Sequence, residues 1–164
     1  MSSPKEEGAV ERSAQADAFA DTEDFVTFTI ANQLFGIPVL AVQDVLSSHN
    51  ITRIPLAPPE IAGSLNLRGR IVTAMDVRLR LGLPPRDRKA SMSIVAEHEG
   101  ELYSLMVDSV GEVLALKGSA WERNPPTLDP KFRDYSLGIY RLDDQLLVVL
   151  DVNRLLDYDR VQAA

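Results

Sequence analysis

The amino-acid sequence predicts a mainly β protein built from two small β-barrels that lie side by side. Short runs in which apolar and polar residues alternate are separated by turn residues, and the same series of runs occurs twice along the chain. Only two short segments have the pattern of helices. Because copies of this size rarely stand alone, we expect two pseudo-symmetric lobes that are packed together over a broad interface.

The repeat is visible in two pairs of segments. Residues 32–46 (NQLFGIPVLAVQDVL) align with residues 100–114 (GELYSLMVDSVGEVL), and residues 63–81 align with residues 138–156. Either match alone could arise by chance. Both matches in the same order indicate two copies of one unit.

The start of the chain differs in composition from the rest. Residues 1–22 are rich in Ala, Ser, Glu and Asp and poor in bulky apolar residues. They bury too little to offset the entropy lost on ordering, which predicts a disordered N-terminal tail, with a short helix around residues 14–20 as the alternative. The folded domain is expected over residues 23–160, with lobe 1 at about residues 23–85 and lobe 2 at about residues 90–160.

Each copy is expected to begin with strands. Residues 35–39 and their twins 103–107 have apolar side chains at every second position, which predicts a strand with one buried face. Ala41 and Gly111 then break the alternation, which indicates a bulge or bend of the kind that small barrels need.

A hairpin and a short helix follow in each copy. Asp76 and Asp151 occupy twin positions at the expected helix starts, where a carboxylate accepts a hydrogen bond from a free backbone amide. The first helix is predicted from Val77 to Leu81, ending at Gly82, and the second from Val152 to about Tyr158.

Valines recur at twin positions around the predicted bend. We expect a core position for four of them, Val39, Val45, Val107 and Val113. Val42 and Val110 follow the bend, where the strand changes face. Two interpretations remain open for this pair: they are core residues, or they line an apolar groove between the lobes that suits a partner helix.

The first hairpin has an unusual turn. The sequence NLRGR (66–70) places Arg68 and Arg70 around a glycine, whereas the twin turn is Asp143-Asp144-Gln145. If turn geometry alone selected these residues, the equivalent turns of both copies would require similar residues. We therefore expect a role for Arg68 that is special to the first copy, with solvated surface charge as the alternative.

Composition disfavours several classes of function. The net charge of −7 opposes nonspecific nucleic-acid binding, which depends on neutralising phosphates. The chain has no cysteine, so disulfides and thiolate zinc sites are excluded. No stretch approaches the roughly 20 apolar residues of a membrane span. The N-terminal residues lack the apolar segment of a secretory signal, so we expect a cytoplasmic protein.

The sequence contains no recognisable catalytic constellation. Its two histidines, His49 and His98, lie far apart in polar surroundings typical of loops. Asp76 and Asp151 could be mistaken for a catalytic carboxylate pair, but twin helix caps explain them better. We expect no catalytic, cofactor-binding or metal-binding residues, and a binding role instead.

The run ITRIPLAPPEIAGSLNLRGRIVTAMDVRLRLG (51–82) resembles the signature of the CheW family of chemotaxis coupling proteins. The segments VDSVGEVLAL (107–116) and LLVVLDVNRLL (146–156) are similar to motifs in the second half of that family. The resemblance covers about residues 24–158. It implies two five-stranded SH3-like β-barrel lobes with short helices and no active site.

The resemblance also implies partners. Members of the family couple the cytoplasmic tips of methyl-accepting chemoreceptors to the regulatory domain of the histidine kinase CheA. The protein is then expected to be a non-catalytic cytoplasmic adaptor, recruited to receptor arrays near the membrane without contacting the membrane or nucleic acid. A scaffold of the same fold in a non-chemotactic receptor–kinase array is the main alternative. An enzyme with an unrecognised site and a nucleic-acid-binding barrel are more remote alternatives.

Site residues can be carried over by motif. The family's receptor groove lies between the lobes and corresponds here to Val42 and Asp44 in VQDV and to Arg68 in NLRG, to which the repeat adds Val110. The family usually has Glu at position 44 and Pro at the position of Thr73. The kinase contact is expected near the proline-rich connection of the second copy, at Pro125, Pro126 and Leu128.

Overall fold

The computed structural model describes residues 21–47, 50–88 and 91–157. The predicted tail, residues 1–22, lies outside these ranges except for its last two residues. The strands are β1 (Thr22–Ile30), β2 (Gln33–Pro38), β3 (Val42–Leu46), β4 (Ile61–Leu67), β5 (Arg70–Asp76), β6 (Met92–His98), β7 (Glu101–Val107), β8 (Ser109–Lys117), β9 (Trp121–Glu122), β10 (Ser136–Arg141) and β11 (Leu146–Leu150). The helical segments are η1 (Val39–Ala41), α2 (Val77–Arg80), η3 (Gly118–Ala120), α3 (Pro130–Arg133) and α4 (Val152–Leu156).

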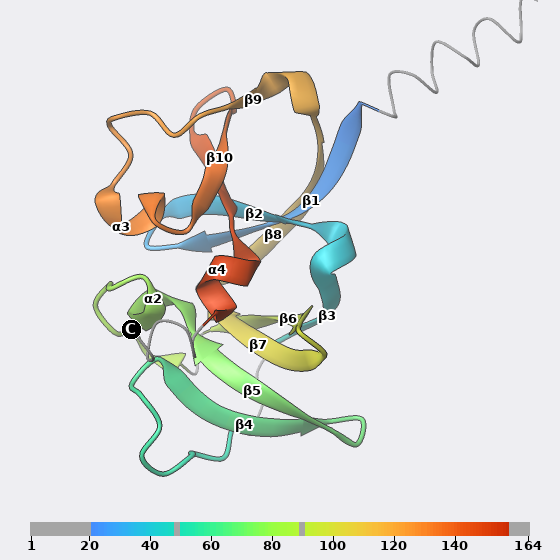
Figure 1. Cartoon of the computed structure of the whole chain (residues 1–164), viewed down its shortest axis with the longest axis vertical. Helices are drawn as coiled ribbons and strands as arrows, with labels where there is room; N and C mark the ends of the chain where they lie inside the picture. The colour runs from blue at the N-terminus through green and yellow to red at the C-terminus, as the bar shows by residue number, and fades with distance from the viewer. Residues whose placement is uncertain (1–20, 48–49, 89–90, 158–164) are drawn as a thin grey trace, which may run out of the picture.

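The strands form two sheets, which lie one above the other in Figure 1 with α2 and α4 at the level where they meet. We call the sheet with the order β8-β1-β2-β11-β10-β9 the terminal lobe, and the sheet with the order β3-β6-β7-β5-β4 the central lobe. The central lobe has five strands, and the two-residue strand β9 adds a sixth to the terminal lobe. This architecture confirms the prediction of a mainly β fold with two lobes and short helices.

The expected lobe boundaries, about 23–85 and about 90–160, are wrong because neither lobe is a continuous half of the chain. The terminal lobe combines the β1–β2 hairpin of the first copy with β8 to β11 of the second copy. The central lobe combines the β6–β7 hairpin of the second copy with β3, β4 and β5 of the first copy. The chain crosses into the central lobe through η1 and returns between β7 and β8. An alternating pattern shows that a strand bends, but it does not show which sheet the strand enters afterwards.

The strand register preserves the repeat. β11 pairs in parallel with β2, and Leu147 lies opposite Leu34. β5 pairs in parallel with β7, and Val72 lies opposite Leu102. The sequence repeat aligns Leu34 with Leu102 and Val72 with Leu147. The two lobes therefore share strand order and residue pairing, as a pseudo-symmetric duplication requires.

Both strands that follow a crossover contain the expected bulge. The register shifts between Val42 and Asp44 in β3, and between Val110 and Val113 in β8. An extra residue turns the side chains beyond it to the opposite face of the strand. The prediction that Val45 and Val113 are core residues is therefore wrong, and they are 40% and 57% exposed.

Three apolar clusters stabilise the fold. The largest contains residues from both lobes, and in it Val107 is buried while Val39 is half-buried against it, broadly as predicted. Each lobe also has a cluster of its own, because alternate residues of its strands point to opposite faces. The cluster of the central lobe includes Leu65, Val72, Leu102 and Met106, and that of the terminal lobe includes Phe25, Tyr140, Leu147 and Val149.

The twin glycines Gly63 and Gly138 leave room for the chain that follows β3 or β8 to pair with the hairpin of the same lobe. In the terminal lobe β9 pairs with β10, and in the central lobe Thr52 forms a bridge with Ser64. A Cβ at Gly63 would lie 2.2 Å from the carbonyl oxygen of Thr52, and a Cβ at Gly138 would lie 2.1 Å from Nε1 of Trp121. Both glycines also have a positive φ, 151° and 143°, which other residues rarely adopt.

The predicted helix caps are confirmed. Asp76 and Asp151 each accept a hydrogen bond from the backbone amide three residues further along, at 3.3 and 3.1 Å. α2 ends one residue before the predicted Leu81, and Gly82 follows with a φ of 80°. α4 runs to Leu156, whereas its expected end at about Tyr158 lies outside the described residues.

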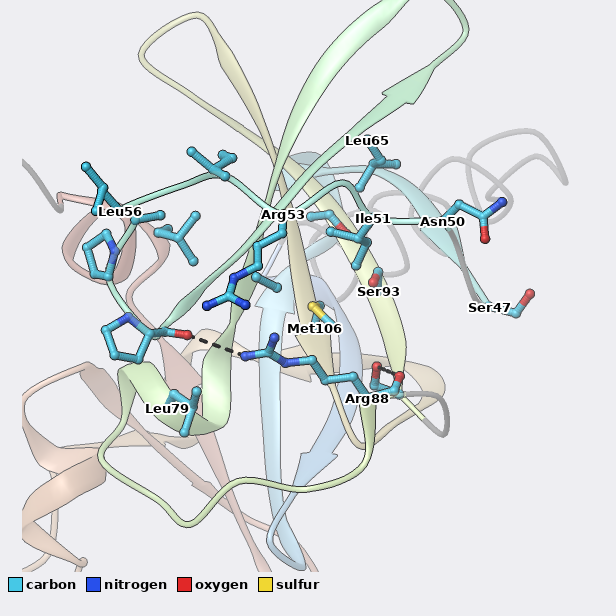
Figure 2. A pocket seen from close by; sticks show the side chains of 18 residues that line it. Ser47, Asn50, Ile51, Arg53, Leu56, Leu65, Leu79, Arg88, Ser93 and Met106 are labelled. Atoms are coloured by element: carbon cyan, nitrogen blue, oxygen red, sulfur yellow. Dashed lines mark hydrogen bonds between the residues drawn. The ribbon is translucent and has the colours of Figure 1, made fainter.

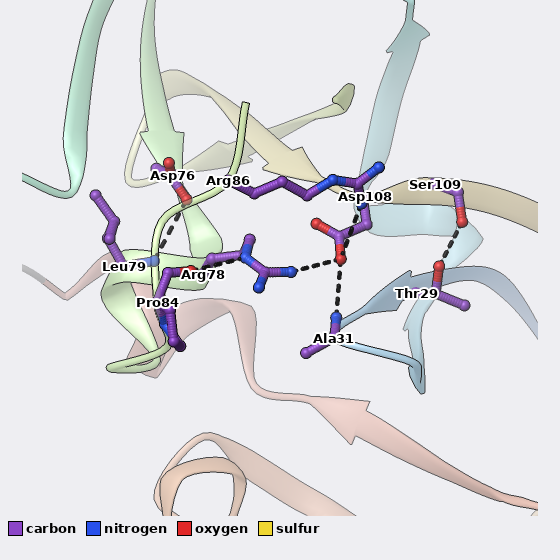
Figure 3. A network of polar contacts seen from close by, with 9 residues as sticks. All are labelled: Thr29, Ala31, Asp76, Arg78, Leu79, Pro84, Arg86, Asp108 and Ser109. Atoms are coloured by element: carbon purple, nitrogen blue, oxygen red, sulfur yellow. Dashed lines mark hydrogen bonds and ion pairs between the residues drawn. The ribbon is translucent and has the colours of Figure 1, made fainter. Parts of the chain in front are cut away.

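A polar network at the second crossover joins the two lobes (Figure 3). Asp108 lies between β7 and β8, and its Oδ2 accepts a hydrogen bond from Nη1 of Arg78 on α2 at 2.7 Å. The same oxygen accepts from the backbone amide of Ala31 in the terminal lobe at 2.9 Å and lies 3.2 Å from Nη1 of Arg86. The twin of Asp108 at the first crossover is Leu40, which is 96% exposed.

Candidate functional site

Asp44 and Arg68, which are predicted to bind a receptor, lie together on the central lobe. Asp44 belongs to β3, and Arg68 lies in the turn between β4 and β5. Nη2 of Arg68 is 3.0 Å from Oδ2 of Asp44, and the side chains are 79% and 24% exposed. The other carboxylate oxygen accepts the backbone amide of Val45 at 2.8 Å. This arrangement holds Asp44 in place and leaves most of the guanidinium open to solvent.

The local sequence determines the shape of this turn. Arg68 and Gly69 are its two central residues, and both have a positive φ, 52° and 85°. Positive φ at both positions is the backbone of a type I′ turn, the usual connection for a two-residue hairpin. The side chain of Asn66 accepts the Gly69 amide at 2.9 Å, which fixes the turn further. Arg68 thus occupies a backbone conformation that is uncommon for a residue with a long side chain.

The twin turn has a different geometry. Neither Asp143 nor Asp144 has a positive φ, and the Leu142 amide donates to the carbonyl of Gln145 at 2.9 Å. The expectation that the two turns require the same backbone conformation is therefore wrong. Gly69 is explained by its own turn, whereas the choice of arginine at position 68 is not.

The two valines near the bend lie in different lobes. Val42 is opposite Ala96 in the central lobe, and Val110 is opposite Phe28 in the terminal lobe. Both are half-buried and pack against the cluster shared by the lobes. The structure therefore places them at the margin of the core, and only Val42 shares a strand with Asp44.

Exposed apolar side chains follow both members of the Asp44–Arg68 pair in the sequence. Val45 is 40% exposed and Ile71 is 77% exposed. Ile71 is not among the residues predicted to bind a partner. The period of two in β5 could have done so, because Val72 and Ala74 are the buried positions and Ile71 then faces outward.

The residues predicted to contact a kinase differ in burial. Leu128 is only 5% exposed and belongs to the shared cluster, so its assignment as a contact residue is wrong. Pro125 is half-buried and Pro126 is exposed. Nη2 of Arg133 donates to the carbonyls of Pro126 and Leu128 at 2.9 and 3.0 Å, which folds this connection back on itself. A proline-rich composition indicates a connection but does not distinguish a contact loop from a packed one.

His98 and the acidic residues of the described ranges provide no evidence of a metal site. His98 lies 3.2 Å from Oδ1 of Asn153, measured from its Nδ1, whereas His49 lies outside the described residues. Within the described ranges, no group of three or more His, Cys, Asp or Glu side chains is arranged to hold a metal ion. The helices in those ranges are also too short or too polar to span a membrane.

Comparison with known proteins identifies the family. The family model described as the CheW-like domain matches residues 24–160. This chain belongs to the CheW-like domain family. A solved structure titled scaffolding protein TtCheW, from Thermoanaerobacter tengcongensis, is similar to it with a TM-score of 0.74 and 32% identity, over 83% of this chain and 93% of that one.

Sequence relatives agree with this assignment. Chemotaxis protein CheW of Helicobacter pylori is 27% identical, over 91% of this chain and 94% of the relative. Chemotaxis protein CheW of Bacillus subtilis is 29% identical, over 87% and 92%. Protein PilI of Pseudomonas aeruginosa is 26% identical, over 75% and 70%.

Proposed function

We propose that this protein is a non-catalytic cytoplasmic adaptor that couples the cytoplasmic hairpin tips of methyl-accepting chemoreceptors to the regulatory domain of the histidine kinase CheA. It binds neither nucleic acid nor membrane directly in this role. Membership of the CheW-like domain family and the names of the relatives support this role.

The observation that supports a receptor contact most directly is the Asp44–Arg68 pair. Its Nη2–Oδ2 distance is 3.0 Å, yet the arginine side chain is 79% exposed. An ion pair this exposed contributes only about 0–1 kcal/mol to folding, so stability alone does not explain it. Asp44 holds one edge of the guanidinium, and the other N–H groups are free to donate to carbonyls or carboxylates of a receptor helix.

We place the rest of the receptor contact on Val42, with Val110 on the terminal lobe as its twin. Both side chains are half-buried, so each offers only part of its surface to a partner. For the kinase, Pro125 and Pro126 remain the proposed contacts, since Leu128 is buried.

The test compares Arg68→Ala with Asp143→Ala, a change in the twin turn. We expect Arg68→Ala to change the free energy of unfolding by less than about 0.5 kcal/mol. It should weaken binding of a receptor fragment by roughly tenfold to a hundredfold, because a charge-assisted contact is lost. Binding of the kinase regulatory domain should be unaffected, and Asp143→Ala should change neither affinity.

Two results would count against the proposal. Normal receptor binding by a folded Arg68→Ala protein would remove the arginine from the interface. Failure of the wild-type protein to bind any chemoreceptor fragment, together with binding to a receptor of another signalling array, would favour the alternative of a non-chemotactic scaffold with the same fold.

A further inference from the structure

The central lobe contains a cavity of about 1100 Å³. Leu65 and Met106, from the lobe's own cluster, form part of its apolar wall, with Ser93 and Ser104 beside them. Figure 2 shows the side chains of Arg53 and Arg88 extending into the same space from opposite sides. The volume is large enough for a small organic ligand.

The sequence repeat explains why the central lobe is hollow. The repeat aligns Pro38 with Met106. Phe25 lies opposite Pro38 and Ser93 lies opposite Met106, so Ser93 is the twin of Phe25. Leu65 is likewise the twin of Tyr140. In the terminal lobe Phe25 and Tyr140 pack against each other, with ring centroids 5.7 Å apart. Replacing both rings by smaller side chains in the same backbone leaves the space unfilled.

The third twin position supplies a polar group to the wall of the cavity. Ser104 aligns with Gly36, where even a Cβ would lie 3.0 Å from Leu147. Ser104 is 1% exposed, and its side chain lines the cavity. Its hydroxyl can donate a hydrogen bond to an oxygen of a ligand bound there.

The charge of the cavity is positive. Nε of Arg88 is 3.0 Å from Oδ2 of Asp76, which neutralises that arginine. Arg53 has no ion-pair or hydrogen-bond partner among the described residues. The described residues that line the cavity include neither aspartate nor glutamate. In a chain with a net charge of −7, this is a local site for an anion.

We propose that this cavity binds a small amphipathic organic anion, with its apolar body against Leu65 and Met106 and its single negative charge at Arg53. Apolar walls stabilise the apolar body by excluding water. The arginine and the serine hydroxyls donate hydrogen bonds to a carboxylate or similar group. This site is separate from the Asp44–Arg68 pair, and its test does not depend on receptor or kinase binding.

The test titrates the full chain with dodecanoate below its micelle concentration, followed by calorimetry. We expect one saturable site. Acetate, which lacks the apolar body, should not bind, and 1-dodecanol, which lacks the charge, should bind about tenfold more weakly. Vesicles of phosphatidylglycerol should not retain the protein; retention that Arg53→Ala abolishes would instead assign the arginine to a membrane surface and overturn the proposal.

Three variants locate the site. Arg53→Ala should weaken dodecanoate binding about tenfold, and Arg123→Ala, a change at an exposed arginine outside the cavity, should leave it unchanged. Ser93→Phe restores the ring present in the twin lobe, so it should abolish binding and raise the melting temperature. If Ser93→Phe does not fold, Ser93→Leu replaces it. Undiminished binding by either folded variant, or equal effects of the two arginine changes, would overturn the proposal.

Discussion

The central and terminal lobes have the same backbone architecture but differ in the side chains of the interior, the hairpin turn and the crossover. Strand order, parallel pairing, bulges, helix caps and the two positive-φ glycines are the same in both. The interior, the hairpin turn and the crossover differ. The comparison shows which features the fold requires, since these occur twice. Features that occur once, such as the Asp44–Arg68 pair and the cavity, are free of that requirement and are the better candidates for function.

The two crossovers also share a backbone role and differ in their side chains. Both carry the chain between the lobes, but among the described residues only the second contains a carboxylate, Asp108, that is 11% exposed and joins elements of both lobes. The first presents Leu40 to solvent. The two crossovers therefore differ in role: the second joins the lobes, and the first presents an apolar side chain at the surface.

The largest expected effect distinguishes the twin glycines. In Gly63→Ala the new methyl group would meet a backbone carbonyl at 2.2 Å, which cannot move without disturbing the pairing of the lobe. In Gly138→Ala it would meet the side chain of Trp121, which is 44% exposed and can rotate away. We expect losses in the free energy of unfolding of about 4 and about 2 kcal/mol, measured by urea denaturation. Equal losses would show that φ strain alone dominates.

The next effect concerns the crossovers. Asp108→Ala leaves Arg78, whose side chain is 17% exposed, without its carboxylate partner, and removes an acceptor from the Ala31 amide. We expect a loss of about 2–3 kcal/mol in the free energy of unfolding. Leu40→Ala, the twin change, should stay within about 0.5 kcal/mol because that side chain is exposed. A comparable loss for both variants would refute the role of Asp108 as the joint between the lobes.

A smaller difference is expected at the helix caps. Asp76 caps α2 and also pairs with Nε of Arg88 at 3.0 Å, whereas Asp151 caps α4 without a described ion pair. Thermal unfolding should show a loss of about 2 kcal/mol for Asp76→Ala and about 1 kcal/mol for Asp151→Ala. Equal losses would mean that the contact to Arg88 adds nothing to stability.

The smallest expected effect is a change in the free energy of unfolding that has opposite sign at the two turns. Arg68 has a φ of 52°, so Arg68→Gly relieves an unfavourable backbone conformation and should stabilise the protein by about 0.5 kcal/mol. Asp143 has no positive φ, so Asp143→Gly only increases the freedom of the unfolded chain and should destabilise by a similar amount, about 0.5 kcal/mol. Urea midpoints measured in parallel resolve the two directions.

Local features could be predicted from the sequence because they depend on neighbouring residues. The alternation at Phe35 and Ile37 identified a strand, and Asp76 and Asp151 identified helix starts, since a cap needs only its own turn. The break at Gly111 identified a bulge. Self-alignment revealed the duplication, and family motifs selected Asp44 and Arg68 without indicating that they pair.

Only the tertiary structure decided how the copies combine. Periodicity is a property of one strand, whereas sheet membership depends on which hairpin fills the place beside it, so the exchange of β1–β2 and β6–β7 between lobes left no local signal. The bulges reversed the faces of Val45 and Val113, and packing buried Leu128. The hollow beside Ser93 arises in the same way: the sequence contains each small residue, but a cavity exists only where several of them meet across strands.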